Sequence, residues 1–158
     1  MTIPTDAKSL KIHVGKMKGG RKKKIVSKIA KPDRAVMRRV LIVDDHEDAA
    51  TYMSLLIRQQ GNDTRVALSG AEAVTIAGKY LPHFVLIDIN MPDMDGYETV
   101  HKLRQVPSLI NSCLVAITAN SSDAVYTRIL TVGFDKFFAK PVDIELLQSF
   151  LRSRMISG

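Results

Sequence analysis

The sequence predicts an α/β fold in which five parallel strands form one sheet between two layers of helices. Five short apolar runs, rich in β-branched residues, alternate with five segments whose apolar residues recur at helical spacing. The runs are apolar on both faces, which is typical of strands that helices cover on both sides. Parallel neighbours also need crossover connections, and the intervening helices supply them. The expected architecture is a doubly wound, three-layer (βα)₅ sandwich.

Composition is that of an ordinary globular protein: of 158 residues, 46% are hydrophobic and 25% are charged. The length predicts about one domain. The single cysteine, Cys113, excludes an internal disulfide framework and favours a reducing compartment, and we expect it to be a small buried hydrophobic residue. The sequence contains neither a bilayer-spanning apolar run nor an N-terminal signal, so we expect a cytoplasmic protein without a membrane span.

Charge divides the chain into two segments. Residues 1–39 contain 13 of the 23 Lys and Arg residues and two of the 16 Asp and Glu residues, so their net charge is +11 and that of the remainder is −4. We therefore predict a basic arm at residues 1–37 and a folded domain at residues 38–156. Repelling lysines and adjacent glycines at the centre of the arm predict disorder there. Because Met37 directly precedes the first strand, an internal start at this residue is an open alternative.

The first predicted strand and helix follow residue 38. Residues 40–43 form a continuous apolar run that ends at an acidic pair, Asp44 and Asp45. The next segment carries apolar residues at i, i+3, i+4 and i+7 and stops at Gly61, which is typical of an amphipathic helix. The residues predicted to form its buried face are Ala49, Tyr52, Met53 and Leu56.

A second strand and helix are predicted over residues 64–82. Residues 64–68 form the strand, and Ser69 with Glu72 three positions later is the pattern of a capping box at a helix N-terminus. Pro82 ends the helix. The residues predicted to pack this helix onto the sheet are Ala71, Val74, Ala77, Gly78 and Leu81.

The remaining strands are predicted at residues 84–87, 114–117 and 136–139, each followed by a helix. A loop rich in Gly, Pro and Asp separates the third strand from its helix, and we expect Asp93 and Asp95 to serve turn geometry there. The expected anchors of the last two helices are Val125, Ile129, Val132, Ile144, Leu147 and Leu151.

Reactive side chains follow four of the five strands. Asp44 and Asp45 follow the first strand, Asp88 the third, Thr118 the fourth and Lys140 the fifth. Because ligands of open parallel sheets bind beyond the carboxyl ends of the strands, we expect these groups to meet. Three adjacent carboxylates repel one another unless a cation intervenes, and oxygen ligands suit Mg²⁺. A carboxylate can also accept a phosphoryl group, a transfer that needs mainly positioning and charge neutralisation.

Four motifs at these strand ends, taken together and in order, resemble those of the receiver domain of response regulators in two-component signalling. The motifs are residues 40–45, 86–96, 116–119 and 138–141. The resemblance covers about three quarters of the chain and none of the basic arm. It implies a CheY-like, flavodoxin-like fold with strand order 2-1-3-4-5. It also implies a signalling domain that is not a classical enzyme and assists only its own phosphorylation and dephosphorylation.

The resemblance also implies roles for the acidic residues. Asp88 would be the phosphoacceptor and also one of the metal ligands. Asp45 would bind Mg²⁺ directly, Asp44 largely through water, and the backbone carbonyl of Asn90 would complete the protein ligands. Asn90 and Asn120 occupy the two variable positions that tune the lifetime of the phosphoryl group.

Further roles fall on the fourth and fifth strands. Lys140 would contact the phosphoryl group, and its bond to Pro141 would be cis, as is usual in the family. Thr118 would move toward the phosphoryl group. Phe137 stands at the aromatic switch position, where the family often has Tyr. Because Phe has no hydroxyl, an output that depends on a tyrosine hydroxyl is not expected.

The implied partners are a histidine kinase or a histidine phosphotransfer protein, and a downstream protein bound by the face of the fourth helix, fifth strand and fifth helix. The chain ends after the fifth helix, so we expect output through protein contacts rather than through a C-terminal DNA-binding domain. Three alternatives stay open: the C-terminal receiver of a hybrid histidine kinase, a nucleic-acid-associated regulator that uses residues 1–37, and a degenerate scaffold. The complete set of site residues disfavours the scaffold.

The histidines and loops predict no other chemistry. His46 follows the acidic pair, but we expect it in the first turn of the helix rather than as a metal ligand. His13, His83 and His101 have no matching partners in the sequence. There is neither a nucleophile-elbow motif nor a Gly-rich phosphate loop, so a hydrolase and a nucleotide-binding protein are both disfavoured.

Overall fold

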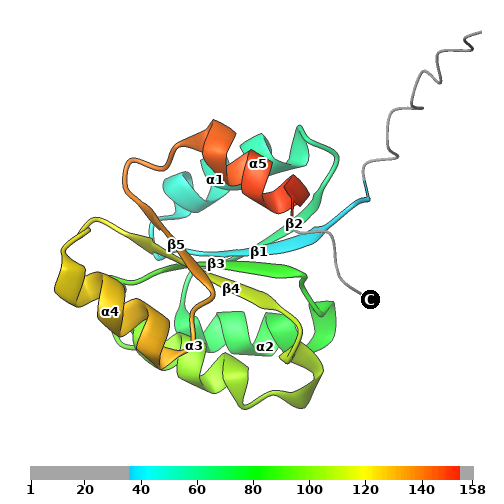
Figure 1. Ribbon diagram of the computed structural model, residues 1–158. Coiled ribbons are helices and arrows are strands. Elements are labelled where there is room, and N and C mark those ends of the chain that lie inside the picture. The colour runs from blue at the N-terminus through cyan, green and yellow to red at the C-terminus, as the bar shows by residue number, and fades with distance from the viewer. Residues whose placement is uncertain (1–35, 154–158) are drawn as a thin grey trace, which may run out of the picture. The chain divides into compact units, whose positions relative to one another are not determined.

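The structure is a computed structural model that describes residues 36–153 (Figure 1). The predicted disorder of the arm therefore falls on residues that lie, except for the last two, outside the described part of the chain. No helix within the described range is long and apolar enough to cross a membrane.

Strands and helices alternate along the described residues as predicted. The strands are β1 (Arg39–Val43), β2 (Asp63–Ala67), β3 (Phe84–Asp88), β4 (Cys113–Thr118) and β5 (Lys136–Ala139). The helices are α1 (Glu47–Arg58), α2 (Gly70–Tyr80), α3 (Gly96–Arg104), a 3-10 turn η1 (Pro107–Leu109), α4 (Asp123–Val132) and α5 (Ile144–Ser153). The strands form one parallel sheet in the order β2-β1-β3-β4-β5, which confirms the predicted fold and strand order.

The helices cover the two faces of the sheet in separate layers. Helices α1 and α5 lie on one face, and α2, α3 and α4 lie on the other (Figure 1). Two apolar clusters fill the spaces between these layers and the sheet: Val40, Ile57, Leu86 and Leu147 belong to one, and Leu41 to the other. Strands β1, β3 and β4 contribute to both clusters because their alternate residues point to opposite faces.

The buried face of α1 differs from the predicted one. Ala50, Ser54 and Ile57 are buried, whereas the side chain of Tyr52 is 64% exposed. The helix carries apolar residues on more than one side. Hydrophobic spacing alone is therefore compatible with two different buried faces, which are shifted by about one residue along the sequence. The hydroxyl of Ser54 lies 2.7 Å from that of Thr64 on β2, and this hydrogen bond allows a polar side chain on the buried face.

One of the two hydrogen bonds of the predicted capping box forms at the N-terminus of α2. Ser69 accepts a hydrogen bond from the backbone amide of Glu72 at 3.2 Å, but the Glu72 carboxylate accepts from Leu68 rather than from Ser69. The predicted packing is wrong for Ala71, Gly78 and Leu81: the first two are exposed, and Leu81 ends the helix in the left-handed conformation and is 42% exposed. Tyr80 is buried in its place, and its hydroxyl bonds Asp63. The buried residues of α2 are Gly70, Ala73, Ala77 and Tyr80.

The connection from β3 to α3 passes very close to the end of β3. A Cβ atom on Gly96 would lie 2.7 Å from the backbone oxygen of Asp88 and 2.7 Å from the Cα of Ile89, so only glycine fits without displacement of the backbone. Asp95 caps α3 by accepting from the amide of Glu98 at 2.8 Å, as its predicted turn role requires. This tight turn fixes the backbone that carries Asp88.

Candidate functional site

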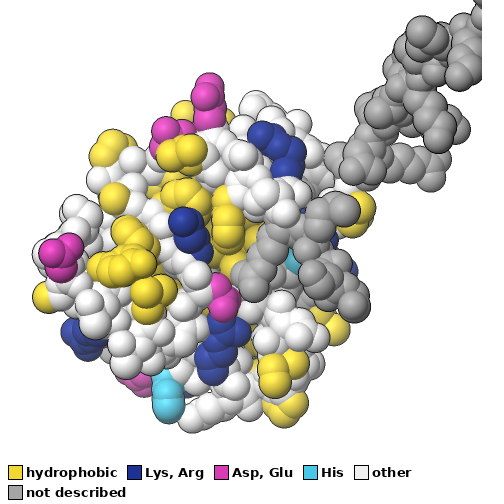
Figure 2. Space-filling model, in the orientation of Figure 1, with side chains coloured by type: hydrophobic (Ala, Val, Ile, Leu, Met, Phe, Trp, Pro, Cys, Tyr) yellow, Lys and Arg dark blue, Asp and Glu magenta, His cyan; other side chains and the backbone are white. Residues whose placement is uncertain are grey.

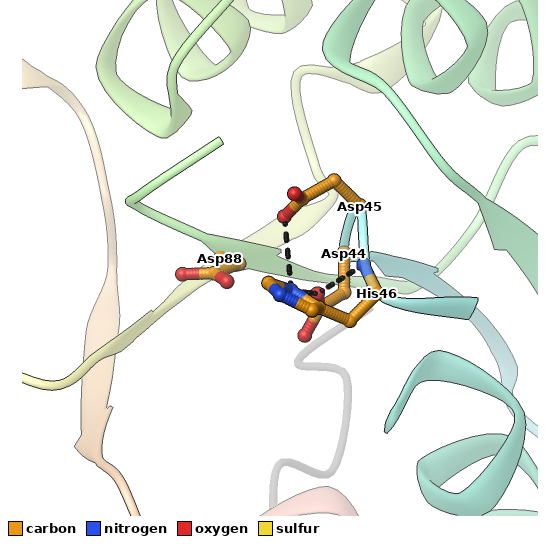
Figure 3. A group of neighbouring side chains, drawn as sticks. All are labelled: Asp44, Asp45, His46 and Asp88. Atoms are coloured by element: carbon orange, nitrogen blue, oxygen red, sulfur yellow. Dashed lines mark hydrogen bonds and ion pairs between the residues drawn. The ribbon is translucent and has the colours of Figure 1, made fainter. Parts of the chain in front are cut away.

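Three carboxylates and one imidazole meet at the carboxyl ends of β1 and β3. The group consists of Asp44, Asp45, His46 and Asp88, and one ligand atom of each lies within 4.8 Å of the others (Figure 3). The pairing of β1 with β3 places Asp88 beside the acidic pair. Asp88 is 3% exposed and Asp44 is 9% exposed, so these two carboxylates are largely withdrawn from solvent, whereas the His46 side chain is exposed.

Lys140 approaches the same group from the end of β5. Its Nζ lies 2.8 Å from Oδ2 of Asp88 and 3.8 Å from Oδ2 of Asp44. Burial by itself lowers the pKa of Lys140, but the hydrogen bond to Asp88 and the charges of the three carboxylates outweigh burial and raise this pKa above its usual value. The side chain is therefore an ammonium at neutral pH. The Lys140–Pro141 bond is cis, as the family resemblance implied.

The acidic group fits a divalent cation. Three carboxylates face one ammonium, which leaves an excess of negative charge. Oδ1 of Asp45 is buried and accepts no hydrogen bond from the described residues, and Nδ1 of His46 lies 3.3 Å from it. A buried carboxylate oxygen without a donor costs free energy unless a cation pairs with it. Carboxylate oxygens at a partly open edge are ligands that suit Mg²⁺.

Thr118 lies beside this group with its hydroxyl already engaged. The residue is 1% exposed at the end of β4. Its Oγ1 donates to the backbone oxygen of Asn120 and accepts from the backbone amide of Asn120, both at 3.1 Å. A turn of this hydroxyl toward Asp88 therefore requires both bonds to Asn120 to break. On the other side of the site, the amide of Asn90 donates to Oδ1 of Asp88 at 3.0 Å.

Phe137 is half-buried on β5 and contacts an aromatic residue that the sequence analysis did not select. The rings of Phe137 and Tyr126 meet edge to face, with centroids 5.1 Å apart and an interplanar angle of 67°. Tyr126 is 45% exposed on α4. It lies outside the apolar stripe of its helix, so helical spacing alone gave no signal for this contact.

A cavity of about 470 Å³ adjoins the site between α1 and the start of α5. Asp88 and Lys140 line it together with apolar side chains. Ala49 and Tyr52, which hydrophobic spacing assigned to the core, line this cavity instead. Part of the apolar stripe of α1 thus faces a space next to the functional site.

A parallel sheet in this order with an acidic group and a lysine at its carboxyl edge is the arrangement that the sequence motifs predicted. The family model of the response regulator receiver domain matches residues 40–152, and the chain belongs to this family. It is 35% identical over 116 residues to the probable transcriptional regulatory protein TcrX of Mycobacterium tuberculosis, with 72% of this chain and 48% of TcrX covered. The chain thus spans about half the length of TcrX.

Two further proteins are similar to this chain, and the second supports the same assignment. An uncharacterized 14.6 kDa protein of Leptolyngbya boryana is 30% identical over 110 residues, which cover 69% of this chain and 84% of that protein. The structure of Vibrio cholerae chemotaxis protein CheY4 superposes with a TM-score of 0.71 at 27% identity, covering 75% of this chain and 99% of CheY4. The chain thus contains a receiver domain, a signalling domain and not a classical enzyme.

Proposed function

We propose that Asp88 accepts a phosphoryl group from a phosphohistidine of a histidine kinase or a histidine phosphotransfer protein. The observation that supports this role best is the ammonium of Lys140 at 2.8 Å from the buried Asp88 carboxylate, next to the acidic pair. In the proposed site, Asp45 and the backbone carbonyl of Asn90 would hold Mg²⁺ directly, Asp44 would hold it largely through water, and Asp88 would be a further ligand. When bound, Mg²⁺ supplies charge neutralisation for the phosphoryl oxygens.

The proposed transfer is a nucleophilic displacement at phosphorus. A carboxylate oxygen of Asp88 forms the new bond to phosphorus, the bond from phosphorus to the donor nitrogen breaks, and its electron pair leaves with the imidazole. Lys140 exchanges its contact with the Asp88 carboxylate for one with a phosphoryl oxygen. The same groups assist hydrolysis of the acyl phosphate, and Asn90 and Asn120 tune its lifetime.

The proposed signal is a change in the conformation of the surface formed by α4, β5 and α5. Thr118 gives up its two bonds to Asn120 and donates to the phosphoryl group, and Phe137 turns into the space that Thr118 leaves. Tyr126 moves because its ring rests on Phe137. A downstream protein then distinguishes the two states of this face.

The character of this face supports a protein partner. Figure 2 shows hydrophobic side chains gathered over α4 and near β5 and α5. Leu146 on α5 is 61% exposed, and Tyr126 and Leu130 on α4 are each 45% exposed. Exposed apolar side chains in one area are typical of protein interaction sites.

The test is phosphorylation by a small acyl phosphate, read by intact mass in the presence and absence of Mg²⁺. We expect one phosphoryl adduct on the unmodified chain, none on Asp88→Asn, and a large loss of rate when Mg²⁺ is chelated. Asp93→Asn is the matched control, because Asp93 is an exposed loop residue in a left-handed conformation that Asn tolerates. An adduct that persists on Asp88→Asn would refute the proposed acceptor.

A further inference from the structure

His46 lies against the acidic pair rather than in the helix that follows. Its Nδ1 is 3.3 Å from Oδ1 of Asp44 and 3.3 Å from Oδ1 of Asp45 (Figure 3). The backbone amide of His46 also donates to Oδ1 of Asp44 at 2.9 Å, and the residue is the N-cap of α1. The main chain thus anchors the base of the imidazole at the site, although the ring itself is 73% exposed.

The contact with Asp44 is a long hydrogen bond, and both distances also match the spacing of metal ligands. Hydrogen bonds between nitrogen and oxygen are mostly about 2.9–3.0 Å long. Ligand atoms about 2.0–2.1 Å from a tetrahedral Zn²⁺ lie about 3.3 Å from one another. The two distances from Nδ1 of His46, to Oδ1 of Asp44 and to Oδ1 of Asp45, therefore have nearly the edge length of such a ligand set.

Lone pairs at the site are available for a cation. Oδ1 of Asp45 is buried and accepts no hydrogen bond from any described residue. Lys140 lies next to Asp88, with its Nζ 2.8 Å from Oδ2 of that residue. A second cation could therefore bind at the other end of the group, next to Asp45 and His46. Imidazole nitrogen is a preferred ligand for Zn²⁺ and its first-row neighbours, whereas Mg²⁺ takes oxygen ligands.

We propose that His46 is a nitrogen ligand of this metal site and that the site binds first-row transition ions, Zn²⁺ above Mn²⁺, more tightly than an all-oxygen receiver site does. This inference rests on the metal site of the proposed function. A neutral imidazole donates the lone pair of Nδ1 to the ion, alongside oxygens of Asp44 and Asp45. The order of the two ions follows the general affinity series for divalent metals. Transition ions would then compete with Mg²⁺ for the receiver site.

Calorimetric titrations of the full chain with ZnCl₂, MnCl₂ and MgCl₂ test the selectivity. We expect His46→Ala to lower the affinity for Zn²⁺ by about tenfold or more and the affinity for Mg²⁺ by less than about twofold. The matched control is His101→Ala, an exposed histidine on α3 outside the acidic group, which should change neither affinity. Equal affinities of His46→Ala and the unmodified chain for Zn²⁺ would overturn the proposal.

Pulsed electron paramagnetic resonance of bound Mn²⁺ tests the ligand itself. We expect a coupling to nitrogen in the unmodified chain and its loss in His46→Ala. Mn²⁺ bound without a nitrogen coupling overturns the role of His46 and leaves the proposed Mg²⁺ site standing. If the unmodified chain binds none of the three ions, both the role of His46 and the proposed metal site are wrong.

Discussion

The central strands and the α4–β5 edge of the domain differ in how firmly they are packed. All residues of β3 and β4 are buried, and so are four of the five residues of β1. By contrast, the residues of β5 are exposed or half-buried, and among the described residues of α4 only Ile129 is buried. Strand β5 is also an edge strand, paired on one side with β4.

This difference in packing fits the two tasks that the proposed function gives to the two regions. Asp44, Asp88 and Thr118 stand at the ends of the buried central strands, where close packing fixes their positions. Phe137 and Lys140 stand on or next to the lightly packed edge. Regions with few buried contacts rearrange at the lowest free-energy cost. In the proposed function, the rigid platform of β1, β3 and β4 holds the acceptor, and the thinly packed α4–β5 edge reports its state.

The largest expected effect comes from a matched pair of leucines. Leu41→Ala in β1 removes a side chain that is 0% exposed and should lower the free energy of unfolding by about 2–5 kcal/mol. Leu130→Ala in α4 removes one that is 45% exposed and should lower it by about 1 kcal/mol or less. Urea denaturation measures both changes. Similar losses at the two positions would break the contrast between platform and edge.

A smaller effect is expected from a matched pair of glycines. Gly96→Ala places a methyl group 2.7 Å from the backbone of Asp88 and should lower the free energy of unfolding by about 1–3 kcal/mol. Gly78→Ala, an exposed position inside α2 with nothing within 4 Å of the new Cβ, should raise it by about 0.5–1 kcal/mol. Thermal or urea denaturation measures whether each substitution lowers or raises the free energy of unfolding. An unchanged free energy of unfolding in Gly96→Ala would show that the backbone at the turn after Asp88 can shift to accommodate the methyl group.

Much of the fold and the composition of the site could be predicted from the sequence. Short apolar runs and alternating helices specify a parallel sheet, and the topology of such a sheet brings all strand ends to one edge. The proximity of Asp44, Asp88 and Lys140 follows from that rule alone, although the residues are far apart in sequence.

The details that the sequence analysis missed depend on side-chain direction. The apolar residues of α1 permit two buried faces, and only the packed structure selects Ala50 and Ile57 over Tyr52. The ring of His46 was expected in a first helical turn, but its residue is the N-cap, so the ring turns toward the acidic pair. The contact of Tyr126 with Phe137 joins two elements, and periodicity within one helix carries no information about it.

Amide hydrogen exchange of the domain before and after phosphorylation tests the central claim most directly. We expect altered exchange in α4 and β5, where packing is light, and unchanged protection in β1, β3 and β4. Asp88→Asn treated with the same phosphodonor should show no change in either region. Altered exchange confined to the central strands, or spread evenly over the domain, would contradict a rigid platform that signals through the α4–β5 edge.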